Sequence, residues 1–87
     1  MKIVVYTDPG HGWAAVKKSK LVELGIADKV SSYSYERGET AYLEEDCDLS
    51  LLVGALKANG ITPVWVDKHT DRRHPIRSYA TYKKPAI

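Results

Sequence analysis

Two short runs of the sequence hold the residues whose types and spacing could do chemistry. The first, residues 8–13, reads Asp-Pro-Gly-His-Gly-Trp and sets His11 between two glycines in a turn. The second, residues 40–48, surrounds Cys47, the only cysteine, with four carboxylates. Imidazole and carboxylate groups bind metal ions or transfer protons, and a thiol near a helix start can act as a nucleophile. The two runs together suggest one site.

Metal binding needs more ligands than the local spacing offers. A hydrolytic zinc site requires about three protein ligands and an open position for water. His11 could recruit Glu44 or Glu45 as a second ligand, but His69 and His74 lie far away in the C-terminal segment. The acidic run also lacks the glycine and the alternating ligands of a calcium loop. We therefore expect no metal ion, no stoichiometric zinc and no other cofactor.

Cys47 has the wrong neighbours for a nucleophile. A reactive thiol needs positive charge to stabilise its thiolate, whereas Asp46 and Asp48 flank this one with negative charge. We expect Cys47 to be buried and structural, at a corner between a strand and a helix. One of the two aspartates should cap that helix. These arguments predict that the chain is not an enzyme.

Length and composition set the frame that must hold these residues. Eighty-seven residues make one domain with one modest core. The apolar content of 44% and the charged content of 28% are ordinary for a soluble globular protein. No apolar run approaches the roughly 18 residues of a membrane span, so we expect no membrane association. A single cysteine favours a reducing cytoplasm.

Hydrophobic periodicity predicts seven regular elements. Strands are expected at 2–7, 13–16, 31–36, 39–44 and 61–66, and Pro63 makes the last an edge strand or delays its start to Val64. Ser19 and Gly25 mark the two ends of a short helix, and residues 48–59 form a longer one through Leu49, Leu52, Val53 and Leu56. The prediction is an α+β two-layer sandwich of order β-β-α-β-β-α-β, with a mostly antiparallel sheet and two helices on one face.

The predicted topology has a consequence for the site. If the first and fourth strands run parallel, as adjacent central strands would, residues 8–13 and 44–48 emerge at the same carboxyl edge of the sheet. We expect the two runs to be neighbours there. The single domain should span residues 1–68, and residues 69–87 should form a basic, partly irregular tail that can be removed without loss of the fold.

Charge is distributed unevenly along the chain. Residues 36–48 have six carboxylates against one arginine, and residues 67–87 have six basic side chains against two aspartates. Basic and aromatic residues alternate in the tail, which suits phosphate contact and base stacking. The nucleic-acid candidates are Arg72, Arg73, Arg77, Tyr79, Lys83 and Lys84. Packing of the tail over the sheet, anchored by Ile76 and Tyr79, is the alternative that we favour, because the sequence pI near 8.7 is low for a dedicated nucleic-acid binder.

Two resemblances to known families follow from these motifs. Residues 4–12 resemble the opening of zinc-dependent N-acetylmuramoyl-L-alanine amidases, but that family has further ligands in a larger domain, so we set it aside. Residues 3–79 resemble a family of small uncharacterised proteins of tailed bacteriophages. The matching pieces are residues 8–13, 24–26, 32–35, 42–48 and 76–79. This second resemblance implies an accessory protein in the cytoplasm of an infected bacterium, and it implies no activity.

The sequence therefore predicts a non-enzymatic binding module, monomeric or homodimeric, that acts on a host bacterial protein such as a defence factor. Aromatic anchors and carboxylates would supply the contact surface. Its expected residues are Asp8, His11, Trp13, Tyr33, Tyr35, Tyr42, Glu44, Glu45 and Asp46. Two alternatives stay open, namely nucleic-acid binding through the tail and a small metal-dependent enzyme that uses His11 with the acidic corner.

Overall fold

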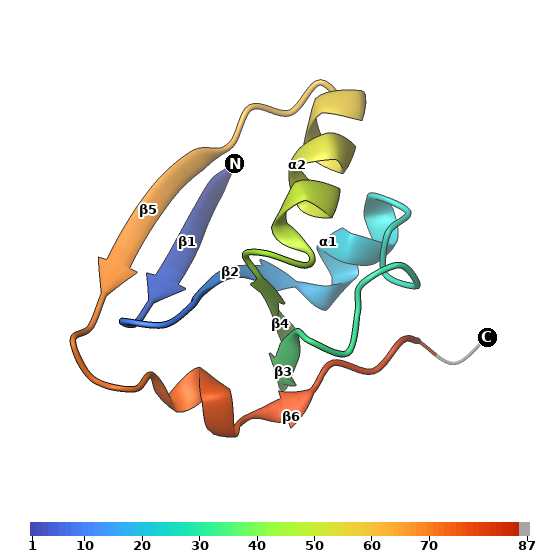
Figure 1. Ribbon diagram of the computed structural model, residues 1–87. Coiled ribbons are helices and arrows are strands. Elements are labelled where there is room, and N and C mark those ends of the chain that lie inside the picture. The colour runs from blue at the N-terminus through green and yellow to red at the C-terminus, as the bar shows by residue number, and fades with distance from the viewer. Residues whose placement is uncertain (86–87) are drawn as a thin grey trace.

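The computed structural model describes residues 1–85, which form a six-stranded sheet and two α-helices (Figure 1). The elements follow the order β1 (Lys2–Thr7), β2 (Gly12–Lys17), α1 (Lys18–Glu23), β3 (Tyr35–Arg37), β4 (Thr40–Glu44), α2 (Leu49–Ala58), β5 (Val64–His69), the 3-10 helix η1 (Pro75–Ser78) and β6 (Ala80–Thr81). Within these residues no helix is long and apolar enough to cross a membrane.

The strands lie in the order β5-β1-β2-β4-β3-β6. Every neighbouring pair is antiparallel except β1 with β5, which is parallel. The predicted α+β class, with a mostly antiparallel sheet and two helices, is confirmed. As Pro63 indicated, the fifth strand begins at Val64 and lies at the edge. The sequence did not predict β6, a two-residue strand that pairs with β3 at the other end of the sheet.

One face of the sheet carries the main core, because alternate residues of a strand point to the same side. Ile3 of β1, Ala14 of β2 and Leu43 of β4 are buried in a single cluster with residues of both helices. The helices contribute Leu21 from α1 and Leu52 and Leu56 from α2. The apolar spacing of α2 therefore predicted Leu49, Leu52 and Leu56 correctly, whereas Val53, which it also placed on the buried side, is not in this cluster.

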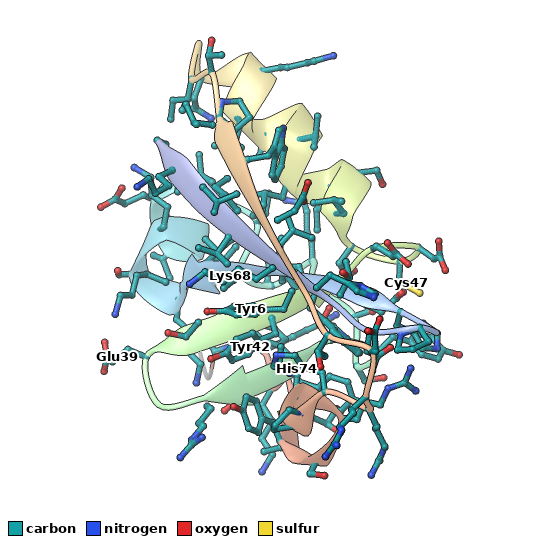
Figure 2. All side chains as sticks on the ribbon, turned by 90° about the vertical axis from the view of Figure 1, so that its left-hand side faces the viewer. Tyr6, Glu39, Tyr42, Cys47, Lys68 and His74 are labelled. Carbon is teal, nitrogen blue, oxygen red and sulfur yellow. The ribbon has the colours of Figure 1, made fainter. Side chains whose placement is uncertain are left out.

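The opposite face is covered by the C-terminal segment. Figure 2 shows Tyr6, Tyr42 and His74 together on this face, and the His74 ring lies 5.2 Å from the Tyr6 ring. Tyr79 packs against Tyr42 at the same ring separation. Ile76, inside η1, is completely buried. The segment after residue 68 thus packs over the sheet, as the alternative with Ile76 and Tyr79 as anchors proposed.

Some element boundaries differ from the predicted ones, because residues at the ends of the elements form other hydrogen bonds. Helix α1 starts at Lys18 and not at Ser19, because β2 runs straight into it with Lys17 at the cap position and no side-chain cap. Strand β3 is limited to three residues, because Ser34 is drawn into hydrogen bonds with the loop. Gly25 ends α1 with φ of 73°, as predicted.

Leu52→Ala should lower the free energy of unfolding by about 2–5 kcal/mol, because the side chain is fully buried between α2 and the sheet. Chemical denaturation measures the change. Val22→Ala on α1 is the control, since Val22 is 61% exposed and should lose little. A loss under about 1 kcal/mol for Leu52→Ala would contradict its place in the core.

Candidate functional site

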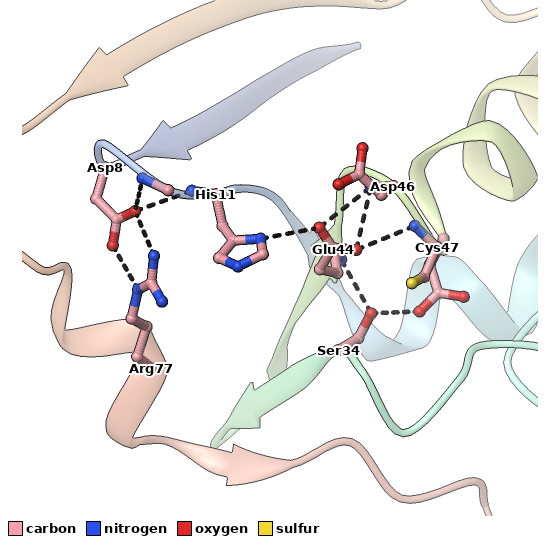
Figure 3. Close-up of polar contacts among 9 residues, drawn as sticks. Asp8, His11, Ser34, Glu44, Asp46, Cys47 and Arg77 are labelled. Carbon is pink, nitrogen blue, oxygen red and sulfur yellow. Dashed lines mark hydrogen bonds and ion pairs between the residues drawn. The ribbon is translucent and has the colours of Figure 1, made fainter.

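The loop after β1 and the corner after β4 meet at one edge of the sheet. His11 Nδ1 lies 3.6 Å from Glu44 Oε1 (Figure 3). Their predicted proximity is confirmed, although β1 and β4 are not adjacent. Strand β2 lies between them and runs antiparallel to both, so β1 and β4 point the same way and end at the same edge.

Asp8 fixes the first run through a buried ion pair with the C-terminal segment. Arg77 donates from Nε to Asp8 Oδ2 at 2.7 Å and from Nη2 to Oδ1 at 2.8 Å. The same carboxylate accepts backbone N–H groups of Gly10, His11 and His74, each at 3.0 Å. The Arg77 hydrogen bonds, with these backbone bonds, hold the pKa of Asp8 well below its usual range despite burial.

The close approach of Arg77 explains Gly10. A Cβ at this position would lie 2.6 Å from Arg77 Nη2, which is too short for a real contact. The guanidinium also lies over the Trp13 ring, with Cζ 5.6 Å from its centroid. Glycine therefore lets the loop, the arginine and the indole pack together.

Glu44 and Asp48 organise the second run. The buried Glu44 carboxylate accepts the backbone N–H groups of Asp46 and Cys47 at 3.0–3.1 Å. Ser34 Oγ accepts the Glu44 N–H at 3.0 Å and donates to Asp48. Asp48 holds the N-cap position of α2 without a side-chain bond to the helix, since its carboxylate also accepts from Ser31. The expectation that Asp46 or Asp48 caps α2 is therefore right about the position, which Asp48 holds, whereas the side-chain hydrogen bond of a cap is not formed.

Cys47 is exposed, so the expectation of a buried structural cysteine is also wrong. Its backbone N–H donates to the buried Glu44 carboxylate, while the residue itself lies at the exposed rim of the pocket. Hydrogen bonding to Glu44 raises the pKa of the thiol, and burial and the charges of Glu44, Asp48 and Asp46 raise it further. The thiol is accordingly protonated near neutral pH, which does not favour a nucleophile.

A pocket of about 300 Å³ lies where the two runs meet. Its walls combine aromatic rings with carboxylates, and its lining residues are His11, Trp13, Tyr33, Tyr35, Glu44, Asp46, Cys47 and Arg77. Trp13 is 1% exposed, and its Nε1 has no hydrogen-bond partner among residues 1–85. Tyr33, at 70% exposed, stands free at the rim. A larger hollow of about 430 Å³, lined by parts of β1, β2 and α1 together with Thr40, has no aromatic residue in its lining.

The structure brings six of the nine expected site residues to this pocket and leaves three outside. Asp8 is bound to Arg77, and Tyr42 lies on the tyrosine-covered face between Tyr6 and Tyr79. Glu45 is exposed, with its carboxylate against Gly12. Arg77 and Ser34 were missed as parts of the site. No local signal marked either, because each acts on a residue far away in the sequence.

Two of the six nucleic-acid candidates have side chains that are engaged elsewhere. Arg77 pairs with Asp8, and Tyr79 packs on Tyr42 and accepts a hydrogen bond from Arg37. The Lys83 backbone donates to Glu36 at 2.8 Å. Arg72, Arg73, Lys83 and Lys84 are exposed residues whose side-chain charges remain, and four such charges make a small phosphate-binding surface.

His11, Glu44 and Asp46 form a group that could hold a metal ion. One ligand atom from each residue lies within 4.8 Å of the others. Imidazole and carboxylate groups in this arrangement can also attract an organic cation or carry a proton. The geometry thus supports the binding of either a metal ion or an organic cation.

Comparison of the chain with protein-family models, with curated proteins and with solved structures gives no significant match.

Proposed function

We propose that this chain is a small, non-enzymatic binding module whose pocket receives a basic side chain of a protein partner. The observation that carries the proposal is the composition of the pocket, in which the rings of Trp13, Tyr33 and Tyr35 stand beside the carboxylates of Glu44 and Asp46. Aromatic faces and carboxylates both attract a lysine or arginine head group.

The partner class in this proposal comes from the sequence resemblance to tailed-bacteriophage proteins. A phage accessory protein in the cytoplasm of an infected bacterium meets host proteins, and a defence factor is one such partner. Binding suits the pocket better than covalent catalysis, because its exposed thiol has a raised pKa.

Tryptophan fluorescence offers a direct test, because Trp13 lies in the pocket and the chain has two tryptophans. The Trp65→Phe variant leaves Trp13 as the sole reporter. Titration with an arginine-containing peptide should give a saturable change in emission, and a matched glutamate-containing peptide should give none. Equal responses to the two peptides would contradict the proposed preference for a cation.

Asp46→Asn and Tyr33→Ala are the informative pocket variants, because both side chains are exposed and the fold does not depend on them. Each should weaken peptide binding at least about tenfold, which corresponds to ~1.4 kcal/mol. Asp71→Asn is the matched control, since Asp71 is an exposed carboxylate of the C-terminal segment.

A host protein that is captured from bacterial lysate by the wild type should be lost with Tyr33→Ala and kept with Trp65→Ala. Retention by both variants would place the binding surface elsewhere.

A further inference from the structure

Three potential metal ligands converge although they are far apart in the sequence. His11 comes from the loop after β1, and Glu44 and Asp46 come from the end of β4 and the corner that follows. We propose that these three side chains bind one divalent transition-metal ion of the zinc, nickel or manganese type. The inference rests on the geometry of the three side chains and not on the proposed protein partner. The ion would use the same carboxylates as the basic side chain of the proposed function, so the two ligands would compete for one pocket.

The distances suit one shared ion. Bonds from zinc to imidazole nitrogen or carboxylate oxygen are about 2.0–2.2 Å, so ligand atoms of one ion lie roughly 3–4 Å apart. The His11–Glu44 separation of 3.6 Å already falls in this range, and all three ligand atoms lie within 4.8 Å of one another. His11 has 46% of its side chain exposed and Asp46 is exposed, so both can close on the ion without disturbing the core.

Glu44 is held ready by its surroundings. Its carboxylate accepts two backbone N–H groups from the corner, which fixes its orientation (Figure 3). Metal-binding carboxylates are commonly oriented in this way by hydrogen bonds from the protein. The loop of His11 is fixed in turn by Asp8, which accepts the His11 N–H. The site therefore has one rigid ligand, Glu44, and two ligands, His11 and Asp46, whose side chains can adapt while their backbone is held by hydrogen bonds.

The carboxylates of the pocket can neutralise a cation, because no lysine or arginine among the described residues is paired with them. Neither Glu44 nor Asp46 forms an ion pair with lysine or arginine within residues 1–85, and Arg77, the nearby cation, is already paired with Asp8. Trp13 lines the same pocket, and its buried Nε1–H lacks an acceptor. A buried donor without a partner calls for an explanation. Three protein ligands leave coordination positions open for water, and further water held in the polar pocket can accept the indole N–H.

The ligand types select the class of ion. Calcium prefers six to eight oxygen ligands, whereas one imidazole with two carboxylates suits zinc, nickel, cobalt or manganese. We expect binding to be weaker than in structural zinc sites, because those use four ligands. The sequence led to the opposite expectation of no metal, because it offered Glu44 as a second ligand to His11 but could not show that Asp46 reaches the same point.

Isothermal titration of chelator-treated protein with Zn²⁺ tests the proposal. The expected result is about one ion per chain, with a rise in Tm on addition of metal, and little response to Ca²⁺. His11→Ala and Asp46→Asn should each weaken Zn²⁺ binding at least about tenfold. The titration contains no peptide, so its outcome does not depend on the proposed partner.

Two controls separate this site from other zinc ligands. His69→Ala removes an exposed histidine that pairs with Asp71 at 3.2 Å, and it should leave Zn²⁺ binding unchanged. Cys47→Ser removes the pocket thiol and should retain binding. The proposal is overturned if the wild type takes up no Zn²⁺, if the His11→Ala Asp46→Asn double variant binds as the wild type does, or if binding is lost with Cys47 alone.

Discussion

Removal of residues 70–87 should unfold the protein or leave only residual helix at room temperature. The deleted segment contains Ile76, which is completely buried, and Tyr82, which donates a hydrogen bond to the Ala27 carbonyl at 2.5 Å. Loss of a buried isoleucine side chain alone costs about 2–5 kcal/mol. The same cut also removes Arg77 and leaves the buried Asp8 carboxylate without its cation. These losses together are comparable with the whole stability of a small domain.

Circular dichroism and thermal unfolding of the truncated chain measure this effect. The triple variant Arg72→Ala, Arg73→Ala and Lys84→Ala is the control, because it removes exposed charge from the segment and keeps its buried contacts. The control should unfold near the wild-type Tm. A truncated chain with a wild-type spectrum and Tm would support the boundary at residue 68 that the sequence predicts.

Elements that depend on nearby residues were predictable from the sequence. Strand β1 was expected at Lys2–Thr7 and is found there, because β-branched alternation and the following Pro-Gly turn define both of its ends. Leu52 and Leu56 are buried on α2, as their spacing requires. Pro63 restricted the last predicted strand to the edge, because it offers no N–H to a neighbouring strand.

Features that depend on distant partners were not predictable. Ile76 is buried next to Arg77, whose ion pair joins the segment to Asp8, a residue 69 positions away. Asp48 carries the sequence signal of a helix cap, but Ser31 and Ser34 compete successfully for its carboxylate. Such competition between possible partners is decided only by the packed structure.

The candidate site contains features that could be predicted from the sequence and features that could not. The meeting of His11 with Glu44 could be predicted from strand directions, since the site lies where two strands end. The separation of Glu45 from Glu44 was missed, although neighbouring residues at the end of a strand face opposite sides and this alternation could have predicted it. Arg77 belonged to a run that suggested nucleic-acid contact, and its role beside Trp13 depends on the way the C-terminal segment crosses the sheet.

Asp8→Asn should lower the Tm at neutral pH by at least about 10 °C, because it breaks a buried charge pair. The Asp8 side chain has no exposed surface, and its carboxylate holds Arg77 and three backbone N–H groups. An asparagine keeps the shape but has one acceptor oxygen and no charge. Arg77 would then lose its bidentate partner and Gly10 and His11 would lose part of their support. Asp71→Asn, at an almost fully exposed carboxylate, should change the Tm little.

The pH dependence of stability distinguishes the charge of Asp8 from its shape. The folded pKa lies well below the ordinary value of 3.8, chiefly because of the Arg77 hydrogen bonds. The stabilisation is therefore fully present above about pH 5. As the pH falls through 3.8 the unfolded chain takes up a proton that the folded chain does not, so stability is lost progressively down to the folded pKa. Below pH 4 the free energy of unfolding of the wild type should fall more steeply than that of Asp8→Asn, by the equivalent of about one proton. Parallel curves for the two proteins would show that Asp8 acts through its hydrogen-bonding shape alone and that its charge adds nothing to the fold.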